Sequence, residues 1–135
     1  DSHAPNPKRQ ATGFETNRLN MLLALLERKL ELPLNSYDVF VNITGGIKIT
    51  ETSADLAILA AIISSFRNRA LSKETIFIGE VSLVGDIREV YQMDQRLKEA
   101  SSQKITKALV AKKPMEHGEI KCYEIDEVSK LLEWF

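Results

Sequence analysis

Hydrophobic residues recur at helical spacing in two segments of the first half of the chain. Between residues 17 and 32, leucines stand at every third or fourth position, which is typical of an amphipathic helix: Leu19, Leu22, Leu23, Leu26 and Leu30. Pro33 ends this helix, because proline disfavours helical backbone in the residue before it. The aliphatic residues of 53–67 cover nearly every direction around a helix axis. We therefore predict that this second helix is buried almost all round.

Two further helices are predicted in the second half of the chain. Residues 93–102 place three apolar side chains on one side of a helix: Met93, Leu97 and Ala100. Residues 126–135 form the last predicted helix. Asp126 is its predicted N-cap, because a carboxylate can accept hydrogen bonds from the first N–H groups of a helix.

Short strands are predicted between these helices, because β-branched and aromatic residues there alternate with polar ones. The predicted strands span 9–14, 37–44, 47–50, 75–81, 81–90, 107–111 and 120–123. Gly45-Gly46 separates the second strand from the third, and Gly85-Asp86 marks a turn inside the fifth. Strands that alternate with helices without strict strand–helix–strand units predict a mixed α/β, or α+β, sheet layered with helices.

The composition describes one domain with a net charge of −1, close to zero. The chain has 135 residues, with 18 Lys and Arg against 19 Asp and Glu. This balance excludes a chain that is basic overall, but it allows a local basic patch. The single cysteine, Cys122, cannot form an internal disulfide, which fits a cytoplasmic protein. No apolar run approaches the ~20 residues that span a bilayer, so no membrane partner is expected.

The first residues are typical of a linker. Residues 1–10 are polar, contain Pro5 and Pro7, and do not begin with Met. We expect residues 1–12 to be a linker from a preceding domain and residues 13–135 to be the folded domain, so that the chain is a C-terminal fragment.

Several kinds of chemistry lack the residues that they need. The sequence contains no G-x-x-x-x-G-K-[ST] loop for nucleotide phosphates. It has no CxxC pair or His/Cys cluster, so no metal site is expected. The two histidines, His3 and His117, lie in polar flanking stretches, which disfavours a Ser-His-Asp triad.

Ser53 stands at the start of the second predicted helix and has two interpretations. A helix N-terminus carries partial positive charge and unpaired N–H donors, which suits a nucleophile as well as a plain helix cap. In the cap interpretation, Thr52 is the N-cap, and Asp55 completes a capping box in place of the usual Glu. In the nucleophile interpretation, the base is a lysine that burial keeps neutral.

Residues 38–111 resemble the proteolytic domain of the Lon family of ATP-dependent Ser-Lys proteases. The matching segments are Asp38 to Asn42, Gly45-Gly46, Ser53-Ala54, Gly79-Glu80, and Val84-Gly85 before Ile87. The resemblance implies a Lon-like α/β fold, a mixed sheet layered with helices. It also aligns Ser53 with the Lon nucleophile.

The same resemblance also indicates that the chain is not a protease. Carried over without gaps, the position of the Lon catalytic lysine falls on Asp94. Lys98, one helical turn further on, is the nearest alternative base. The carboxylate of Asp55 also opposes alkoxide charge on a serine two residues away. Ser53 is therefore interpreted as vestigial.

A longer run of segments resembles the C-terminal, Lon-like domain of the RadA family of bacterial recombination proteins. These segments span residues 6–9, 17–19, 38–42, 50–56, 79–81 and 84–88. The resemblance implies a cytoplasmic ATPase that binds DNA and drives branch migration in recombination and repair. ATP, Mg and Zn are then expected only in domains that precede this one, with no cofactor in this part. It also implies self-association into a ring, expected to be a hexamer.

Basic residues form the second candidate site. Arg67, Arg69 and Lys73 follow the second predicted helix, and smaller groups are Lys104 with Lys107, Lys112-Lys113 and Lys8-Arg9. A solvated helix end is the ordinary interpretation, because Arg and Lys favour helix C-termini. Contact with DNA phosphates is the functional interpretation of the group Arg67, Arg69 and Lys73.

Three hypotheses about function follow. The first is a non-proteolytic domain that serves oligomerisation and DNA binding in a RadA-like repair protein. The alternative is an active ATP-dependent Ser-Lys peptidase of the Lon type. A pure oligomerisation module is the third.

Overall fold

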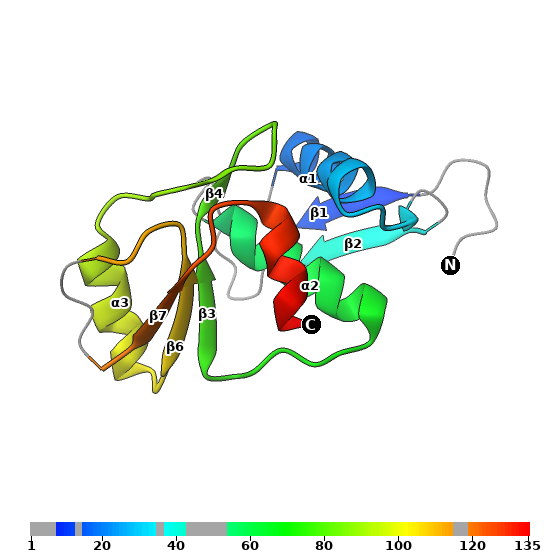
Figure 1. The fold of residues 1–135 in the computed structure, drawn as a ribbon. Helices are drawn as coiled ribbons and strands as arrows, with labels where there is room; N and C mark the ends of the chain where they lie inside the picture. The colour runs from blue at the N-terminus through cyan, green and yellow to red at the C-terminus, as the bar shows by residue number, and fades with distance from the viewer. Residues whose placement is uncertain (1–7, 13–14, 35–36, 43–53, 115–118) are drawn as a thin grey trace. The chain divides into compact units, whose positions relative to one another are not determined.

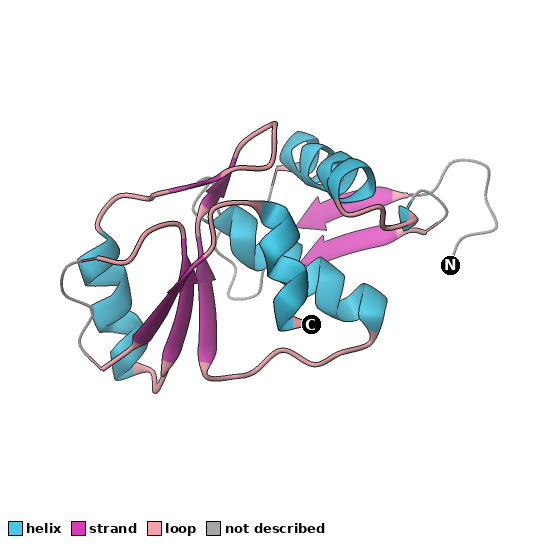
Figure 2. Cartoon of the chain, in the orientation of Figure 1, coloured by secondary structure: helices cyan, strands magenta, loops and turns pink. Residues whose placement is uncertain are grey.

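A computed structural model describes residues 8–12, 15–34, 37–42, 54–114 and 119–135 (Figure 1). The chain divides into two units, residues 1–51 and residues 52–135. Both units combine helices with parallel strands (Figure 2), which confirms the predicted mixed α/β class.

The first unit is built from two parallel strands joined by a helix. Strand β1 (Arg9–Thr12) pairs with β2 (Val39–Asn42), with Arg9 opposite Val39. Helix α1 (Thr16–Lys29) connects them and packs against β1. All five leucines of the predicted apolar face are buried, and Leu25 is buried as well.

Helix α1 ends at Lys29, earlier than the predicted boundary at Pro33. Leu30 is its C-cap, and Glu31 has a left-handed backbone with φ 56°. The N–H of Leu32 then donates to the carbonyl of Leu26 at 3.4 Å. The left-handed turn at Glu31 thus ends the helix two residues before Pro33.

The second unit has a parallel sheet of three strands at its centre. Its strands are β3 (Thr75–Ile78), β6 (Lys107–Val110) and β7 (Lys121–Glu124), with β6 in the middle. A two-stranded antiparallel ladder, β4 (Glu80–Val81) with β5 (Ile87–Arg88), follows β3. Gly85 turns the chain between β4 and β5 with φ 95°, a conformation that glycine adopts readily.

Helices cover both faces of this sheet (Figure 2). On one face, α3 (Met93–Ser102) buries Leu97 and Ala100 against a row of strand residues: Ile78, Ala108, Val110 and Cys122. Burial raises the pKa of the Cys122 thiol, which suits a core residue and not a nucleophile. The other face meets α2 (Asp55–Arg67) along β3, together with the C-terminal 3₁₀ helix η3 (Val128–Trp134).

The structure corrects the prediction that the second helix is buried almost all round. Leu56, Leu59 and Ile63 of α2 are fully buried. Ala61 is exposed, however, and Ile62 is only half-buried. The aliphatic residues continue around the helix, but α2 packs chiefly along one face.

The last helix also differs from its prediction. It is a 3₁₀ helix whose N-cap is Glu127, with the Glu127 carboxylate accepting the N–H of Ser129 at 3.0 Å. Asp126 lies one residue too early, because its carbonyl accepts the N–H of Ile87 at 2.9 Å. Its carboxylate pairs instead with Lys130 at 2.7 Å, and this hydrogen bond lowers the pKa of Asp126.

No helix among the described residues has the length and apolar character needed to cross a membrane.

Candidate functional site

The start of α2 holds the candidate nucleophile region. Ser53 and Thr52 lie outside the described residues. The described helix begins at Asp55, and its N-cap is Ala54, which makes no side-chain hydrogen bond. The predicted N-cap, Thr52, stays a prediction because it lies outside the described residues.

Asp55 joins α2 to the strand region. Its side chain is completely buried, and its Oδ2 accepts the N–H of Val81 at 3.0 Å. The next residue, Leu56, donates its N–H to the carbonyl of Gly79 at 3.2 Å. Burying a carboxylate costs free energy unless hydrogen bonds replace its water. The start of α2 is therefore a structural joint with the segment between β3 and β4.

Gly79 allows this joint to close. A Cβ atom at position 79 would lie 2.8 Å from Cγ2 of Ile87 and 3.4 Å from Cδ2 of Leu56. A contact of 2.8 Å is shorter than van der Waals packing permits. Cγ2 is bonded to Cβ of Ile87, so it lies close to the backbone and cannot move far by itself. Position 79 thus needs a residue without a side chain.

Asp94 and Lys98 both lie on α3. Asp94 is in the first helical turn, and both side chains are exposed to solvent. A serine–lysine dyad needs a lysine that is withdrawn from water. Every lysine that the structure describes is exposed. Because Ser53 is outside the described ranges, its pairing with Lys98 or Asp94 stays a prediction.

The structure places the three basic candidates at different points between α2 and β3. Arg67 is the last residue of α2, and its Nη1 donates to the carbonyl of Phe135 at 3.4 Å. Arg69 follows the left-handed residue Asn68, and its N–H donates to the carbonyl of Ser64 at 2.9 Å. Lys73 lies two residues before β3, beyond an extended connection (Figure 1). All three side chains are exposed.

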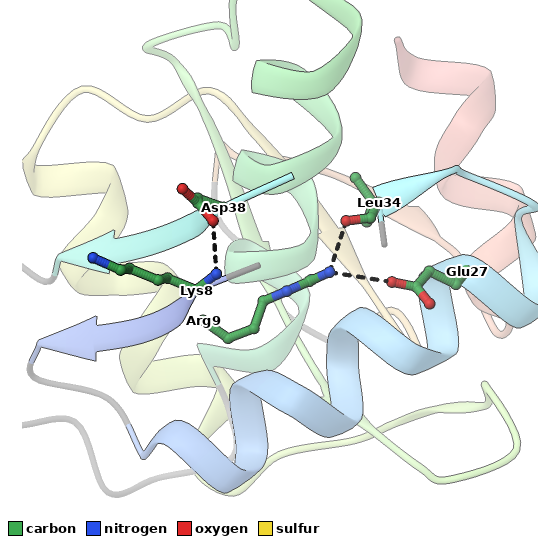
Figure 3. Close-up of polar contacts among 5 residues, drawn as sticks. All are labelled: Lys8, Arg9, Glu27, Leu34 and Asp38. Atoms are coloured by element: carbon green, nitrogen blue, oxygen red, sulfur yellow. Dashed lines mark hydrogen bonds and ion pairs between the residues drawn. The ribbon is translucent and has the colours of Figure 1, made fainter. Parts of the chain in front are cut away.

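Arg9 has a structural role in the first unit (Figure 3). Its Nη2 donates to the carbonyl of Leu34 at 2.7 Å and lies 3.6 Å from Oε1 of Glu27. The backbone N–H of Lys8 donates to Oδ1 of Asp38 at 2.6 Å, while the Lys8 side chain extends away from these contacts. Arg9 therefore holds β1 to α1 and to the segment before β2.

The sequence patterns missed a group of residues on the sheet face opposite α3. It contains Lys121, Tyr123 and Trp134, which stand close together in the second unit. The available signal was that Lys107 begins one predicted strand and Lys121 is the second residue of another. Parallel pairing brings such starting residues to one edge of a sheet.

Metal-binding side chains do not gather in the described ranges. No group of three or more His, Cys, Asp or Glu residues there is arranged to hold a metal ion.

Comparison with known proteins identifies the family. A family model described as subunit ChlI of Mg-chelatase matches residues 10–114. The chain belongs to this ChlI family. The match runs from β1 to the segment after β6, so it includes the joint at Asp55 and most of the parallel sheet.

The ChlI-family chain is also similar to proteins named DNA repair protein RadA. It is 65% identical over 128 residues to that protein of Campylobacter jejuni, which covers 95% of this chain and 29% of the relative. It is 55% identical over 129 residues to the protein of Helicobacter pylori strain 26695, covering 96% and 29%. The Escherichia coli protein is 49% identical over 105 residues, covering 78% and 23%. The chain therefore spans less than a third of the length of these relatives.

Proposed function

We propose that this ChlI-family chain is a non-proteolytic domain of a RadA-like DNA repair protein, and that it contributes DNA binding and self-association. The relatives named DNA repair protein RadA support the repair role, because the Campylobacter jejuni protein among them matches 95% of the chain at 65% identity. In this proposal the ATPase, with its ATP, Mg and Zn, belongs to the remaining length of such a protein. The whole protein then acts in recombination by branch migration in the cytoplasm. The Lon-like character of the domain is part of the same proposal.

The buried carboxylate of Asp55 is the observation that favours a non-proteolytic domain. It lies two residues after Ser53 and is used to hold Val81. A buried acidic side chain near a serine opposes the negative charge that an attacking alkoxide develops. The exposed positions of Lys98 and Asp94 supply no desolvated base from α3. The active Ser-Lys peptidase is therefore the weaker hypothesis.

A serine-directed probe tests this choice. We expect a fluorophosphonate to leave Ser53 unlabelled under conditions in which an active serine protease is labelled within minutes. The physical reason is that every lysine that the structure describes is exposed to solvent, so none of these is withdrawn from water to act as the base. Intact-mass spectrometry of the treated chain measures the labelling, and S53A is the control. Labelling that S53A abolishes would establish the peptidase and overturn the non-proteolytic proposal.

DNA binding is proposed for the exposed cations at the end of α2. The double variant Arg67→Glu and Arg69→Glu is expected to weaken DNA binding at least about tenfold. Each lost phosphate contact should also lower the slope of log K against log salt by about 0.9 on duplex DNA. Fluorescence anisotropy of a labelled duplex, measured across a salt series, gives both quantities.

A matched pair of substitutions controls for net charge. Lys112→Glu and Lys113→Glu change the chain by the same four charges, but these residues follow β6 and lie away from the end of α2. We expect a smaller loss of affinity from this pair. Equal losses in the two double variants would mean that net charge, and not the position of Arg67 and Arg69, controls binding.

Self-association is proposed to produce a ring, with six copies in the longer protein. Apolar side chains at two sites of the second unit offer contact surface: Leu83 is 70% exposed, Val84 61% and Tyr91 90%. Exposed apolar groups of this size are typical of interaction sites. Light scattering measures the assembled mass, and a purely monomeric longer protein would contradict the ring.

A further inference from the structure

Two lysines stand side by side on the sheet face opposite α3. Lys107 on β6 and Lys121 on β7 are direct partners in the parallel register. Adjacent strands lie about 4.8 Å apart, so these ammonium groups share one small area of surface. Like charges directly opposite each other destabilise a sheet. Among the described residues, no carboxylate lies within salt-bridge distance of either lysine.

Aromatic side chains continue this face toward the other end of the strands. Because side chains alternate along a strand, Tyr123 lies on the same face as Lys121, and its ring centroid is 5.4 Å from Nζ of Lys121. The ring of Trp134 meets Tyr123 edge to face at 4.9 Å and is 39% exposed. Lys121, Tyr123 and Trp134 thus form a row of one cation and two aromatic rings.

The end of α2 extends the same surface over β3. Phe135 stacks on Phe77 of β3 with ring centroids 6.3 Å apart. The carbonyl of Phe135 accepts the hydrogen bond from Arg67. We name the surface formed by these residues the basic–aromatic face: Arg67, Lys107, Lys121, Tyr123, Trp134 and Phe135.

We propose that the basic–aromatic face binds single-stranded DNA. This inference rests on the proposed DNA-binding function and specifies its location and the form of DNA. Lys107 and Lys121 each contact a phosphate of the strand. The negative charge of these phosphates relieves the repulsion between the two lysines. An unpaired base stacks on the exposed part of Trp134. Surfaces that hold single strands without sequence preference combine cations and aromatic rings in this way.

A single strand fits this face better than a duplex. The broad faces of bases in a duplex are covered by their neighbours, so an aromatic side chain on a protein surface reaches them only when the bases are unstacked. Glu119, two residues before Lys121, and Glu133, next to Trp134, are exposed carboxylates at the margin of the face. Their charges oppose a phosphate chain, and the contacts of Lys107 and Lys121 with phosphates make the binding weaken as salt rises.

The fluorescence of Trp134 provides a direct test, because the chain contains one tryptophan. Titration with a 20-nucleotide oligothymidylate at low salt is expected to quench Trp134 emission to a saturating level. The double variant Lys107→Gln and Lys121→Gln should bind at least about tenfold more weakly, with the log–log salt slope reduced by about 1.4 for two single-strand contacts. Lys112→Gln with Lys113→Gln is the matched control, since these residues follow β6 at its opposite end, and it should bind like the unmodified chain.

Anisotropy of a labelled oligonucleotide separates this inference from the broader proposal, because it detects DNA bound anywhere on the chain. Binding without a change in Trp134 emission, or with equal losses in the two double variants, overturns the basic–aromatic face and leaves DNA binding standing. Quenching by a duplex as strong as that by the single strand overturns the preference for a single strand. If neither form of DNA binds, the DNA-binding part of the proposed function fails together with this inference. Circular dichroism should show that both double variants keep the native fold, since all four lysines are exposed.

Discussion

Asp55→Ala is expected to lower the free energy of unfolding of the second unit by about 3 kcal/mol. The substitution leaves the N–H of Val81 buried without its acceptor and removes packed atoms from the joint. An unsatisfied buried donor costs about 1–3 kcal/mol, and more where the lost partner is charged. Urea denaturation followed by Trp134 fluorescence measures this effect, because Trp134 lies in the same unit.

Asp94→Ala is the matched control for this experiment. Asp94 also lies in the first turn of a helix, but it is exposed. Its carboxylate stabilises the helix N-terminus of α3 by about 0.3–1 kcal/mol, so its loss should cost no more than that. Asp55→Asn keeps an oxygen acceptor and should lie between the two. Similar values for Asp55→Ala and Asp94→Ala would contradict a structural joint at Asp55.

Gly79→Ala is expected to destabilise the second unit by about 1–3 kcal/mol, the usual cost of forcing extra atoms into a packed site. The new Cβ would stand 2.8 Å from Cγ2 of Ile87, and this atom cannot rotate away without moving the whole side chain. The same urea denaturation measures the loss.

A double-mutant cycle identifies the clash as the cause. Ile87→Ala removes the Cγ2 atom that Gly79→Ala meets, and it has its own cost because Ile87 is buried. Gly79→Ala should cost about 1 kcal/mol less in the Ile87→Ala background than in the unmodified chain. Strict additivity would show that steric contact with Ile87 does not limit position 79.

Local patterns predicted the elements whose boundaries depend on nearby residues. Helix α3 spans the predicted residues 93–102, because its apolar face meets one sheet. The strands β6 and β7 lie within one residue of their predictions. The N-cap of the last helix was predicted one residue too early. A long-range hydrogen bond from Ile87 to Asp126 decides that boundary, and no local pattern contains it.

The candidate site was likewise predicted only where local sequence patterns decide the structure. The sequence indicated that the region of Asp55 matters, through a capping box within one helix. The structure adds a partner of Asp55 at Val81, 26 residues further on, which no local pattern contains. The structure also gives Arg9 a structural role in place of a DNA-binding one, because its guanidinium contacts Glu27 and the carbonyl of Leu34.

The amino-acid sequence by itself determined the mixed α/β class, most of the helices and strands, and the similarity to RadA proteins. These follow from the period of apolar residues and from short motifs, which are local properties of the chain. Only the tertiary structure decided that Asp55 is a buried joint and that Lys107, Lys121 and Trp134 share one face. Strand register and packing bring together residues that are distant in sequence, and side-chain periodicity carries no information about which strands become neighbours.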